Sequence, residues 1–365
     1  MKLSELISAI EAIAPPVLQE DYDNSGLIVG RPEQDVSKAL LTLDCTEAVV
    51  DEAIAEGCGV IVAHHPIVFR GLKRFNESNY VEKTVMKAIR NDVAIYACHT
   101  NLDNVLNKGV NQKIAAKLGL KNVRILAPVK NRLSKLAVYV PENYDDAVRD
   151  AMFSAGAGNI GNYGECSFNI KGNGTFKPEE GSKPFLGERG VRQNENEIRV
   201  ESVLPAYIAG SVMAAVKKVH PYEEVPWDLI SLQNSWQEAG SGLIGELEMP
   251  ISGTEFTDRV KRALGATVIR HTRPVALVKT VAVCGGAGSF LIKTALSAGA
   301  DAYVTADVKY HEFFDAEGRM MICDPGHFES EQFTTEIFHE ILSVKFPNFA
   351  TIFSRTSTNP VLYHY

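Results

Sequence analysis

The chain has 365 residues, of which 45% are hydrophobic and 22% charged, and its formal net charge is -8 at pH 7. This length suffices for two or three domains with hydrophobic cores. The acidic balance argues against non-specific binding to nucleic acid or to an anionic membrane, so neither is expected as a partner. No apolar stretch approaches the ~20 residues that a membrane span requires.

The N-terminal segment and the cysteines both favour a cytoplasmic protein. Residues 1–14 place apolar side chains at helical spacing with Glu5 and Glu11 between them, which is typical of an amphipathic helix and not of a signal peptide. The six cysteines are scattered and form no CxxC pair. We therefore expect reduced, buried thiols.

Apolar runs alternate with helical patterns in two parts of the chain. Such alternation, with short and almost continuously apolar strands, predicts α/β folds with mostly parallel sheets. The predicted elements of the first part are strands 36–46, 59–65 and 92–100, with helices 46–57 and 80–91. Those of the last part are helices 256–265, 289–299, 308–318 and 327–346, with strands 279–286, 300–307, 319–326 and 349–354.

The middle of the chain has a different pattern. Its order is strand, helix, strand, a polar hairpin over 173–196, then strand, helix and strand, which is typical of a ferredoxin-like α+β domain. Because α/β alternation stops before this segment and resumes after it, we interpret it as an insertion. The predicted organisation is two similar α/β units, 1–128 and 237–365, that form a bipartite core around an inserted domain, 129–236.

Two adjacent histidines, His64 and His65, end the predicted strand 59–65. On an ideal strand they would point to opposite faces. Pro66 breaks the strand, so both imidazoles could turn toward the crevice past the strand ends, where open α/β sheets bind ligands. The alternative is one core histidine and one surface histidine.

The segment CHTNLDN (98–104) follows the next strand and contributes His99 and Asp103. Asp103 is a candidate metal ligand or, alternatively, the N-cap of the helix that follows. His99 is a candidate ligand or a partner that orients one.

The segment DPGHFESEQF (324–333) follows another strand. His327 and Glu331 are four residues apart, so they share one face of a helix and could chelate a metal. Asp324 and Glu329 are competing candidates. The alternative explanation is an ordinary acidic first turn.

Together these strand ends supply three histidines and two carboxylates at one edge of a sheet. That exceeds the needs of a single zinc, and a bridging carboxylate suits two metals about 3.5–4 Å apart. Mixed nitrogen and oxygen ligands suit Zn, Mn or Fe, without thiolates. The sequence thus predicts two divalent cations bound by His64, His65, Asp103, His327 and Glu331.

Three other motifs have weaker signals. TADVKYHEFF (305–314) places Asp307 and His311 past a strand, and VCGGAGS (283–289) is either an anion cradle or a tight turn for helix packing. HPYEEVPWD (220–228) gathers His220, Glu223, Glu224 and Trp227, either as a ligand-binding corner or as a helix end broken by Pro221.

The chain resembles the NGG-interacting-factor-three-like family, whose members are often labelled GTP cyclohydrolase type-2 homologues. The resemblance rests on HHP (64–66), CHTNLDN (98–104), GAG (286–288), TADVKYHE (305–312) and GHFESE (326–331), in the family's order. It covers 1–128 and 237–365, and residues 130–236 resemble the PII/CutA-like insert of the longer bacterial members. It implies a dinuclear site with the five ligands above, bridged by Glu331, and a toroidal homohexamer.

Two functions remain open at this point. The first is a metal-dependent hydrolase that acts through metal-activated water on a small molecule, with His99 or His311 as proton shuttle. The family label suggests a nucleotide such as GTP as its substrate. The second is a non-catalytic metal-binding scaffold or regulator, whose insert senses a ligand or gates the cavity.

Overall fold

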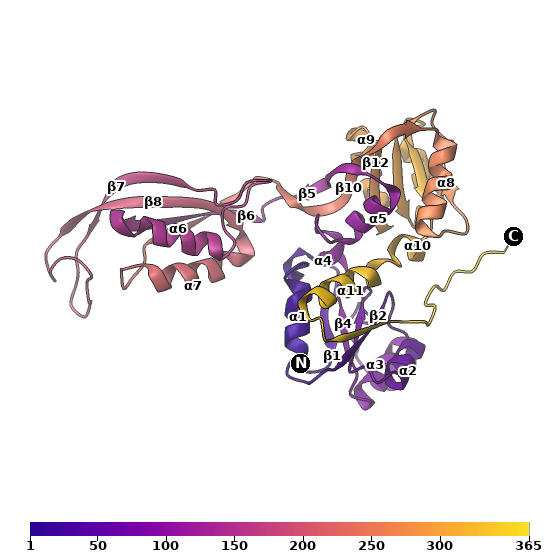
Figure 1. Cartoon of the computed structure of the whole chain (residues 1–365), viewed down its shortest axis with the longest axis horizontal. Helices are drawn as coiled ribbons and strands as arrows, with labels where there is room; N and C mark the ends of the chain where they lie inside the picture. Colours follow the sequence, from indigo (N-terminus) through magenta and orange to yellow (C-terminus); the bar gives the residue numbers. More distant parts are fainter. Residues whose placement is uncertain (365) are drawn as a thin grey trace. The chain divides into compact units, whose positions relative to one another are not determined.

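The computed structural model of the chain describes residues 1–364 and has a mixed α/β fold with parallel and antiparallel pairing in three sheets. Contacts divide it into two compact units (Figure 1). The first, which we call the core unit, comprises Met1–Pro128 and Glu238–Tyr365. The second, the insert, comprises Val129–Gln237.

The first sheet of the core unit has the strand order β1-β4-β3-β2-β15. Its central pairs are parallel, and only β1 runs antiparallel to its neighbour β4. Every residue of β3 and of β4 is buried, as expected for parallel strands that are covered on both faces. The strands are β1 (Gly26–Val29), β2 (Lys38–Thr42), β3 (Val60–Ala63), β4 (Ala94–Ala97) and β15 (Ala350–Phe353).

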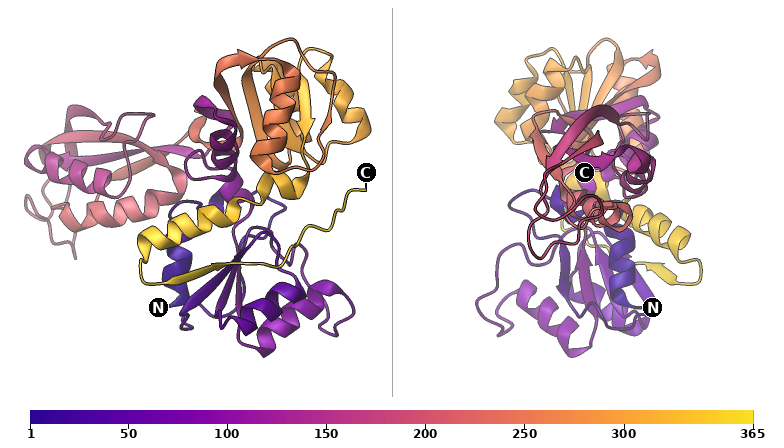
Figure 2. Two further views of the ribbon diagram at one scale, coloured as in Figure 1. Left: turned by 45° about the vertical axis from the view of Figure 1, so that its right-hand side comes forward. Right: turned by 90° about the vertical axis from the view of Figure 1, so that its left-hand side faces the viewer.

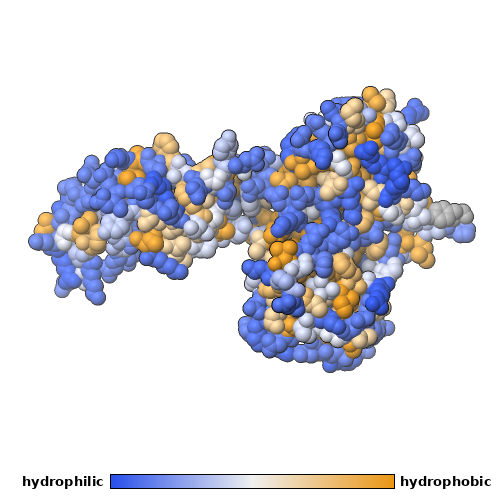
Figure 3. Space-filling model, in the orientation of Figure 1, coloured by the Kyte–Doolittle hydropathy of each residue, from blue (hydrophilic) through white to orange (hydrophobic). Residues whose placement is uncertain are grey.

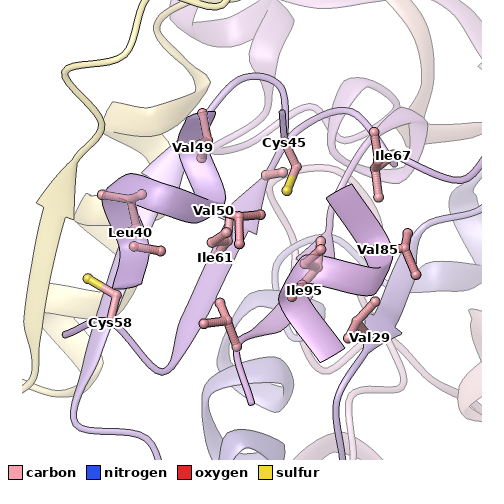
Figure 4. Packing of buried hydrophobic residues seen from close by; sticks show 14 residues of the cluster. Val29, Leu40, Cys45, Val49, Val50, Cys58, Ile61, Ile67, Val85 and Ile95 are labelled. Atoms are coloured by element: carbon pink, nitrogen blue, oxygen red, sulfur yellow. The ribbon is translucent and has the colours of Figure 1, made fainter. Parts of the chain in front are cut away.

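Helices cover both faces of this sheet. Apolar residues of α2 (Glu47–Ala55) and α3 (Tyr80–Arg90) pack against strand residues such as Leu40, Ile61 and Ile95 (Figure 4). Burial of each such side chain stabilises the fold by about 1.5–3 kcal/mol. On the other face α1 (Leu3–Glu11) lies beside α11 (Thr334–Lys345), as both views in Figure 2 show.

The second sheet of the core unit has the order β11-β14-β13-β12-β10-β5. The pairs β12–β13 and β13–β14 are parallel, whereas β10 and β11 pair antiparallel with their neighbours β12 and β14. The sheet is therefore mixed. Its strands are β5 (Lys121–Val129), β10 (Trp236–Ile251), β11 (Arg270–His271), β12 (Val278–Ala287), β13 (Ala302–Ala306) and β14 (Met321–Asp324).

Each of the two sheets contains elements from both the N-terminal and the C-terminal part of the chain. The helix α5 (Val110–Leu118) and strand β5 come from the N-terminal part, yet they pack on and pair within the second sheet, where α8 (Gly253–Leu264) and α9 (Ile292–Ser297) also lie. Conversely, α11 and β15 come from the C-terminal part and complete the first sheet. The two halves are thus tied together by backbone pairing.

Several elements differ from the sequence prediction. The expected helix 308–318 is a 3₁₀ helix, η5 (Tyr310–Ala316), entered from Asp307 in a left-handed conformation with φ 55°. The expected helix 327–346 is interrupted between α10 (His327–Glu331) and α11, where the Thr334 hydroxyl donates to the Glu331 carbonyl at 2.7 Å. Strands β5 and β10 are absent from the sequence prediction, because charged and polar residues in β5 and glycines in β10 obscure the apolar pattern.

The insert has one four-stranded sheet in the order β7-β8-β6-β9, with every neighbouring pair antiparallel. The helices α6 (Asp145–Ser154) and α7 (Ala209–Val219) pack on it around a separate apolar core that includes Val138, Val200 and Val212. The strands are β6 (Leu133–Pro141), β7 (Phe168–Phe176), β8 (Gln193–Pro205) and β9 (Trp227–Leu232).

Hydrophilic residues predominate on the face shown in Figure 3, with apolar residues scattered among them. Among residues 1–364, no helix combines the length and the hydrophobicity needed to cross a bilayer. All six cysteines are free.

Glu52 of α2 fixes the residues after β15 through hydrogen bonds. The carboxylate accepts hydrogen bonds from the Arg355 backbone and from the hydroxyls of Ser354 and Thr356, at 2.6–2.8 Å. Burial raises the pKa of Glu52, but these bonds outweigh it and hold the pKa below its ordinary value. The stabilisation is therefore present above pH ~4.3, the unfolded-state pKa, and lost as the pH falls below it.

We expect Glu52→Gln to lower the free energy of unfolding by about 1 kcal/mol at pH 7. Amide hydrogen exchange at residues 354–356 should become faster. The control is Glu56→Gln, because Glu56 reaches this segment only through a 3.9 Å ion pair with Arg355. Equal exchange rates in wild type and Glu52→Gln would contradict the assignment.

Candidate metal centre

The site includes two adjacent imidazoles, those of His64 and His65, directly after the end of β3. The strand ends at Ala63, and the backbone N–H groups of His64 and His65 both donate to the Leu43 carbonyl. The chain has left the regular ladder here, so the side chains do not alternate. Their ring centroids lie 4.9 Å apart, and both rings face the same rim of the sheet.

The other strand ends bring their residues to the same place. His99 follows β4, and Asp103 is the last residue of the short helix α4 (Thr100–Asp103). Asp103 therefore caps no helix N-terminus, and Gly109 is the N-cap of α5. His327 and Glu331 begin and end α10, one turn apart.

The carboxylate of Glu331 is the centre of the cluster. Its Oε2 lies 3.0 Å from Nε2 of His65 and 3.0 Å from Nε2 of His327. Its Oε1 lies 3.8 Å from Nε2 of His64, which in turn is 3.6 Å from Oδ1 of Asp103. The two oxygens of one carboxylate thus face two different sets of side chains.

The four histidines share one arrangement. Each ring engages an oxygen through Nδ1, and this fixes the ring orientation in the way that is common for metal-binding histidines. The Nε2 atoms are left for the interior of the site. The Nδ1 partners are the Cys98 carbonyl for His64 (2.8 Å), Asp44 for His65 (2.7 Å), Asp23 for His99 (2.8 Å) and Asp307 for His327 (2.7 Å).

Sequence reasoning missed two of these orienting carboxylates. Asp44 comes two residues after β2, so the strand-end criterion that selected the histidines would also have selected it. Asp23 lies before β1 and accepts hydrogen bonds from Thr100 as well as His99. No local pattern around Asp23 distinguishes it from other loop aspartates.

Two buried polar atoms in the cluster have no hydrogen-bond partner among residues 1–364: His64 Nε2 and Asp103 Oδ1. An unpaired buried polar group costs about 1–3 kcal/mol, so such atoms are rare in folded proteins. The two atoms are lone-pair donors that face one another across 3.6 Å. A cation between them would satisfy both, so the residues present fit a metal.

The charges of the cluster also require a cation, because the buried carboxyl groups of Asp103 and Glu331 repel each other. Burial, followed by repulsion from Glu331, raises the pKa of Asp103 well above its usual value. Burial lowers the pKa of His64 to about 4. Burial also opposes the charged form of His65 and His327, but their carboxylate partners outweigh it and raise the two pKa values to about 10 and about 9.

Residues 1–364 contain three groups of side chains that could hold a metal ion. Within each group, the potential ligand atoms lie within 4.8 Å of one another. The groups are His64 with His65 and His99, His65 with His327 and Glu331, and His64 with Asp103 and Glu331. The predicted five residues all occur in these groups. His99 occurs in them too, as the side chain beside His64 and His65.

Three other sequence candidates lie outside the cluster. His311 is exposed on η5, where its ring stacks on Phe314. Asp324 is a structural clamp whose carboxylate accepts from the backbone of Val308 and Gly326. Glu329 lines the cavity but belongs to no ligand group. His311 is also absent from the lining of the cavity beside the cluster.

The glycine-rich turn 283–289 makes room for Glu331. Gly286 has φ 58°, and a Cβ atom there would lie 2.3 Å from Oε1 of Glu331. Its N–H donates to the hydroxyl of Ser330, and the N–H of Gly285 donates to Asn111. This matches the tight-turn alternative, because the turn packs against α10.

The cluster lies at the bottom of a cavity of about 780 Å³, within the range that small-molecule sites occupy. Its wall is rich in carboxylates, and Arg270 is the one arginine or lysine among its described lining residues. The C-terminal segment contributes Asn359 and Val361 to the wall. Just before them, the Thr358 hydroxyl donates to Asp44 at 2.7 Å, so this segment also supports the His65 ring.

The chain is similar to a known protein family and to curated proteins along most of its length. The model of the family described as Duf34/NIF3 (NGG1p interacting factor 3) matches residues 1–360. A protein of Halalkalibacterium halodurans named GTP cyclohydrolase 1 type 2 homolog is 42% identical over 326 residues, which are 88% of this chain and 87% of that protein. The Bacillus subtilis protein of the same name is 38% identical, with 98% and 97% covered.

Solved structures are similar over the full length. A Bacillus cereus protein related to NIF3 has a TM-score of 0.88 at 38% identity and covers 100% of this chain and 99% of its own. Staphylococcus aureus protein SA1388 has a TM-score of 0.77 at 26% identity, with the same shares covered. The fold, including the presence of an insert, is therefore shared with these relatives.

The Glu331 carboxylate leaves no room for a side chain at Gly286. We expect Gly286→Ala to be destabilising because a Cβ atom would displace the Glu331 carboxylate, in addition to about 1–2 kcal/mol of strain from the left-handed backbone. Gly299→Ala has the same kind of strain, with φ 78°, but a Cβ atom there meets nothing within 4 Å. Denaturant unfolding should show the larger loss for Gly286→Ala, and equal losses would contradict the proposed packing.

Proposed function

The chain belongs to the Duf34/NIF3 family, and we propose that it binds two divalent cations and hydrolyses a nucleotide-like small molecule. The observation that carries the proposal is the orientation of Glu331. Its Oε1 faces His64, and its Oε2 faces His65 and His327. A carboxylate that faces two ligand sets in this way is suited to bridging two cations.

The proposed ligands form two sets that share Glu331. One set is His64, Asp103 and Glu331, and it contains both unpaired buried atoms. The other is His65, His327 and Glu331. Imidazole and carboxylate ligands suit Zn, Mn or Fe, whereas the nearby thiol of Cys284 has a pKa raised by burial and is a poor ligand.

Bound divalent cations would supply charge stabilisation and lower the pKa of a coordinated water. The residues of the chain provide positioning and proton transfer. Asp44 and Asp307 fix the rings of His65 and His327. His99 is the proposed proton carrier, because Asp23 holds its Nδ1 and its ring lines the cavity.

The substrate class follows from the cavity and from the names of the relatives. About 780 Å³ accommodates a molecule of nucleotide size. The carboxylate-rich wall would repel phosphate groups in the absence of cations, so a nucleotide would require the metals for binding as well as for chemistry. The name GTP cyclohydrolase 1 type 2 homolog, carried by the relatives, is the reason to begin with GTP.

Five further expectations from the sequence remain proposals. The strand order β7-β8-β6-β9, with both helices on one face, supports a ferredoxin-like insert. The likeness of the insert to PII/CutA proteins, the homohexamer and the cytoplasmic location stay predictions. The boundaries 1–128, 129–236 and 237–365 also stay predictions.

The second candidate function is a metal-binding regulator without turnover. It is favoured by a separate cavity of about 310 Å³ within the insert, since a sensor needs a ligand site of its own. The two functions differ in one measurable respect. The regulator would bind metal stoichiometrically and turn over no substrate.

We predict that metal-free protein binds two Zn²⁺ or Mn²⁺ ions per chain in a calorimetric titration and that its melting temperature rises, because the cations bind only the folded state. Glu331→Gln should lose at least one of the two ions, and Glu340→Gln, an exposed change on α11, should retain both. A single ion in the wild type would contradict the bridging arrangement.

We predict that GTP and a panel of phosphoesters are hydrolysed only by the metal-loaded wild type, and that His65→Ala abolishes turnover. Activity that survives both His65→Ala and Glu331→Gln would come from another site. Two bound ions without turnover on the panel would favour the regulator.

We predict that Asp44→Asn weakens binding of the cation held by His65 and His327 by roughly 10–100-fold, because a neutral amide oxygen replaces the carboxylate that orients the His65 ring. The control is Asp35→Asn, since Asp35 is exposed and pairs with Lys2 only. Metal affinity measured by competition with a chelator would test the effect. Unchanged affinity would show that the negative charge of Asp44 does not support metal binding by His65.

A further inference from the structure

The second cavity, whose described lining residues all belong to the insert, has no ligand assigned to it so far. Its volume is about 310 Å³. It forms between the end of β7, the loop 177–192 and the segment 222–226, which is part of the HPYEEVPWD motif. In that motif His220 serves the end of α7, where its Nε2 contacts the Tyr139 carbonyl at 3.0 Å, but the residues after Pro221 turn toward the cavity.

Aromatic rings form one wall of this cavity. The ring of Tyr222 lies between those of Phe176 and Phe185, with centroid distances of 5.9 and 6.4 Å. The Phe185 side chain is 47% exposed, so the wall is open to an incoming molecule. Rings arranged in this way present π faces that attract cations.

Carboxylates supply the charge. Glu197, Glu223 and Glu224 line the cavity, and no lysine or arginine occurs among its described lining residues. Glu223 is already engaged, because it accepts the Lys183 N–H at 2.8 Å and so fixes the loop 177–192. The local field therefore favours a positively charged ligand.

Glu197 is the residue that indicates a built site. It is only 8% exposed, and its Oε1 accepts the Tyr222 hydroxyl at 2.9 Å. Its Oε2 accepts no hydrogen bond within residues 1–364. Gly174 lies against it, and a Cβ atom at that position would come within 2.1 Å of Oε2. Glu197 makes no ion pair within residues 1–364, so its carboxylate can accept a donor from a ligand in the aromatic cavity.

We propose that the insert binds a small organic cation in this cavity, an ammonium or guanidinium group carried on an apolar body. The charged group would donate to Oε2 of Glu197, and the apolar body would lie against Phe176, Phe185 and Tyr222. The site is independent of the metal centre and belongs to the insert alone.

Three probes that share a ring but differ in charge test the proposal on the full chain. They are phenethylamine, 2-phenylethanol and 3-phenylpropionate, and agmatine serves as a guanidinium probe. Calorimetric titration should show binding of the two cations, at least about tenfold weaker binding of the alcohol and none of the carboxylate. Equal affinity for amine and alcohol, or no binding of either cation, would overturn the proposal.

Variants locate the site and control for folding. Glu197→Gln should weaken phenethylamine binding about tenfold and leave 2-phenylethanol unchanged. Phe185→Ala removes a half-exposed ring and should weaken phenethylamine more than agmatine, so it tests the cavity even if Glu197→Gln folds poorly. Glu180→Gln, an exposed change on the same loop, should bind like the wild type.

Binding should be the same in chelator-treated and metal-loaded protein, since the cavity lies outside the metal centre. Loss of amine binding on chelation would place the ligand at that centre instead and overturn the assignment to the insert. Amine binding that is identical in wild type, Glu197→Gln and Phe185→Ala would overturn it as well.

Discussion

The structure depends on one buried carboxylate, that of Glu331, which must be neutralised without access to bulk water. The imidazoles of His65 and His327 provide this, and hydrogen bonds and charge from the surrounding histidines hold the pKa of Glu331 well below the usual value against the effect of burial. The imidazoles in turn need fixed orientations, which the carboxylates at their Nδ1 atoms and a backbone carbonyl supply. The imidazoles therefore contact the Glu331 carboxylate, and a second set of oxygen atoms accepts hydrogen bonds from those imidazoles.

This requirement explains the local irregularities of the backbone. Gly286 takes a left-handed conformation because Glu331 fills the space of a side chain there. Asp307, which is not a glycine, also has a positive φ, and it presents its carboxylate to His327. Strain of this kind persists where the surrounding contacts determine the conformation, as in many functional sites.

The sequence alone predicted much of the architecture because the evidence was local. Buried parallel strands appear as apolar runs, and residues after the strand ends meet at one edge of a sheet, so the placement of His64, His65 and Glu331 followed from simple rules. Asp23 could not be found in this way, because its partner His99 is 76 residues away. The assignment of these residues as metal ligands stays a prediction.

Long-range pairing was also beyond local reasoning. Nothing in the segment 350–353 shows that it pairs with β2 rather than with its neighbours in sequence, since short apolar strands occur in both sheets. The same holds for β5, whose partners are distant in the chain. Such contacts are decided by packing in the folded state, to which a sequence window has no access.

The exchange of elements between the sheets has a consequence for synthesis in the cell. The edge of β2 is paired by residues 350–353, so about 300 residues must be translated after it before its partner exists. At ~5–20 residues per second this takes on the order of 15–60 s. Throughout that time the nascent chain exposes an open apolar strand edge, which is a template for aggregation. We expect chaperone protection during translation to matter more for this protein than its modest size suggests.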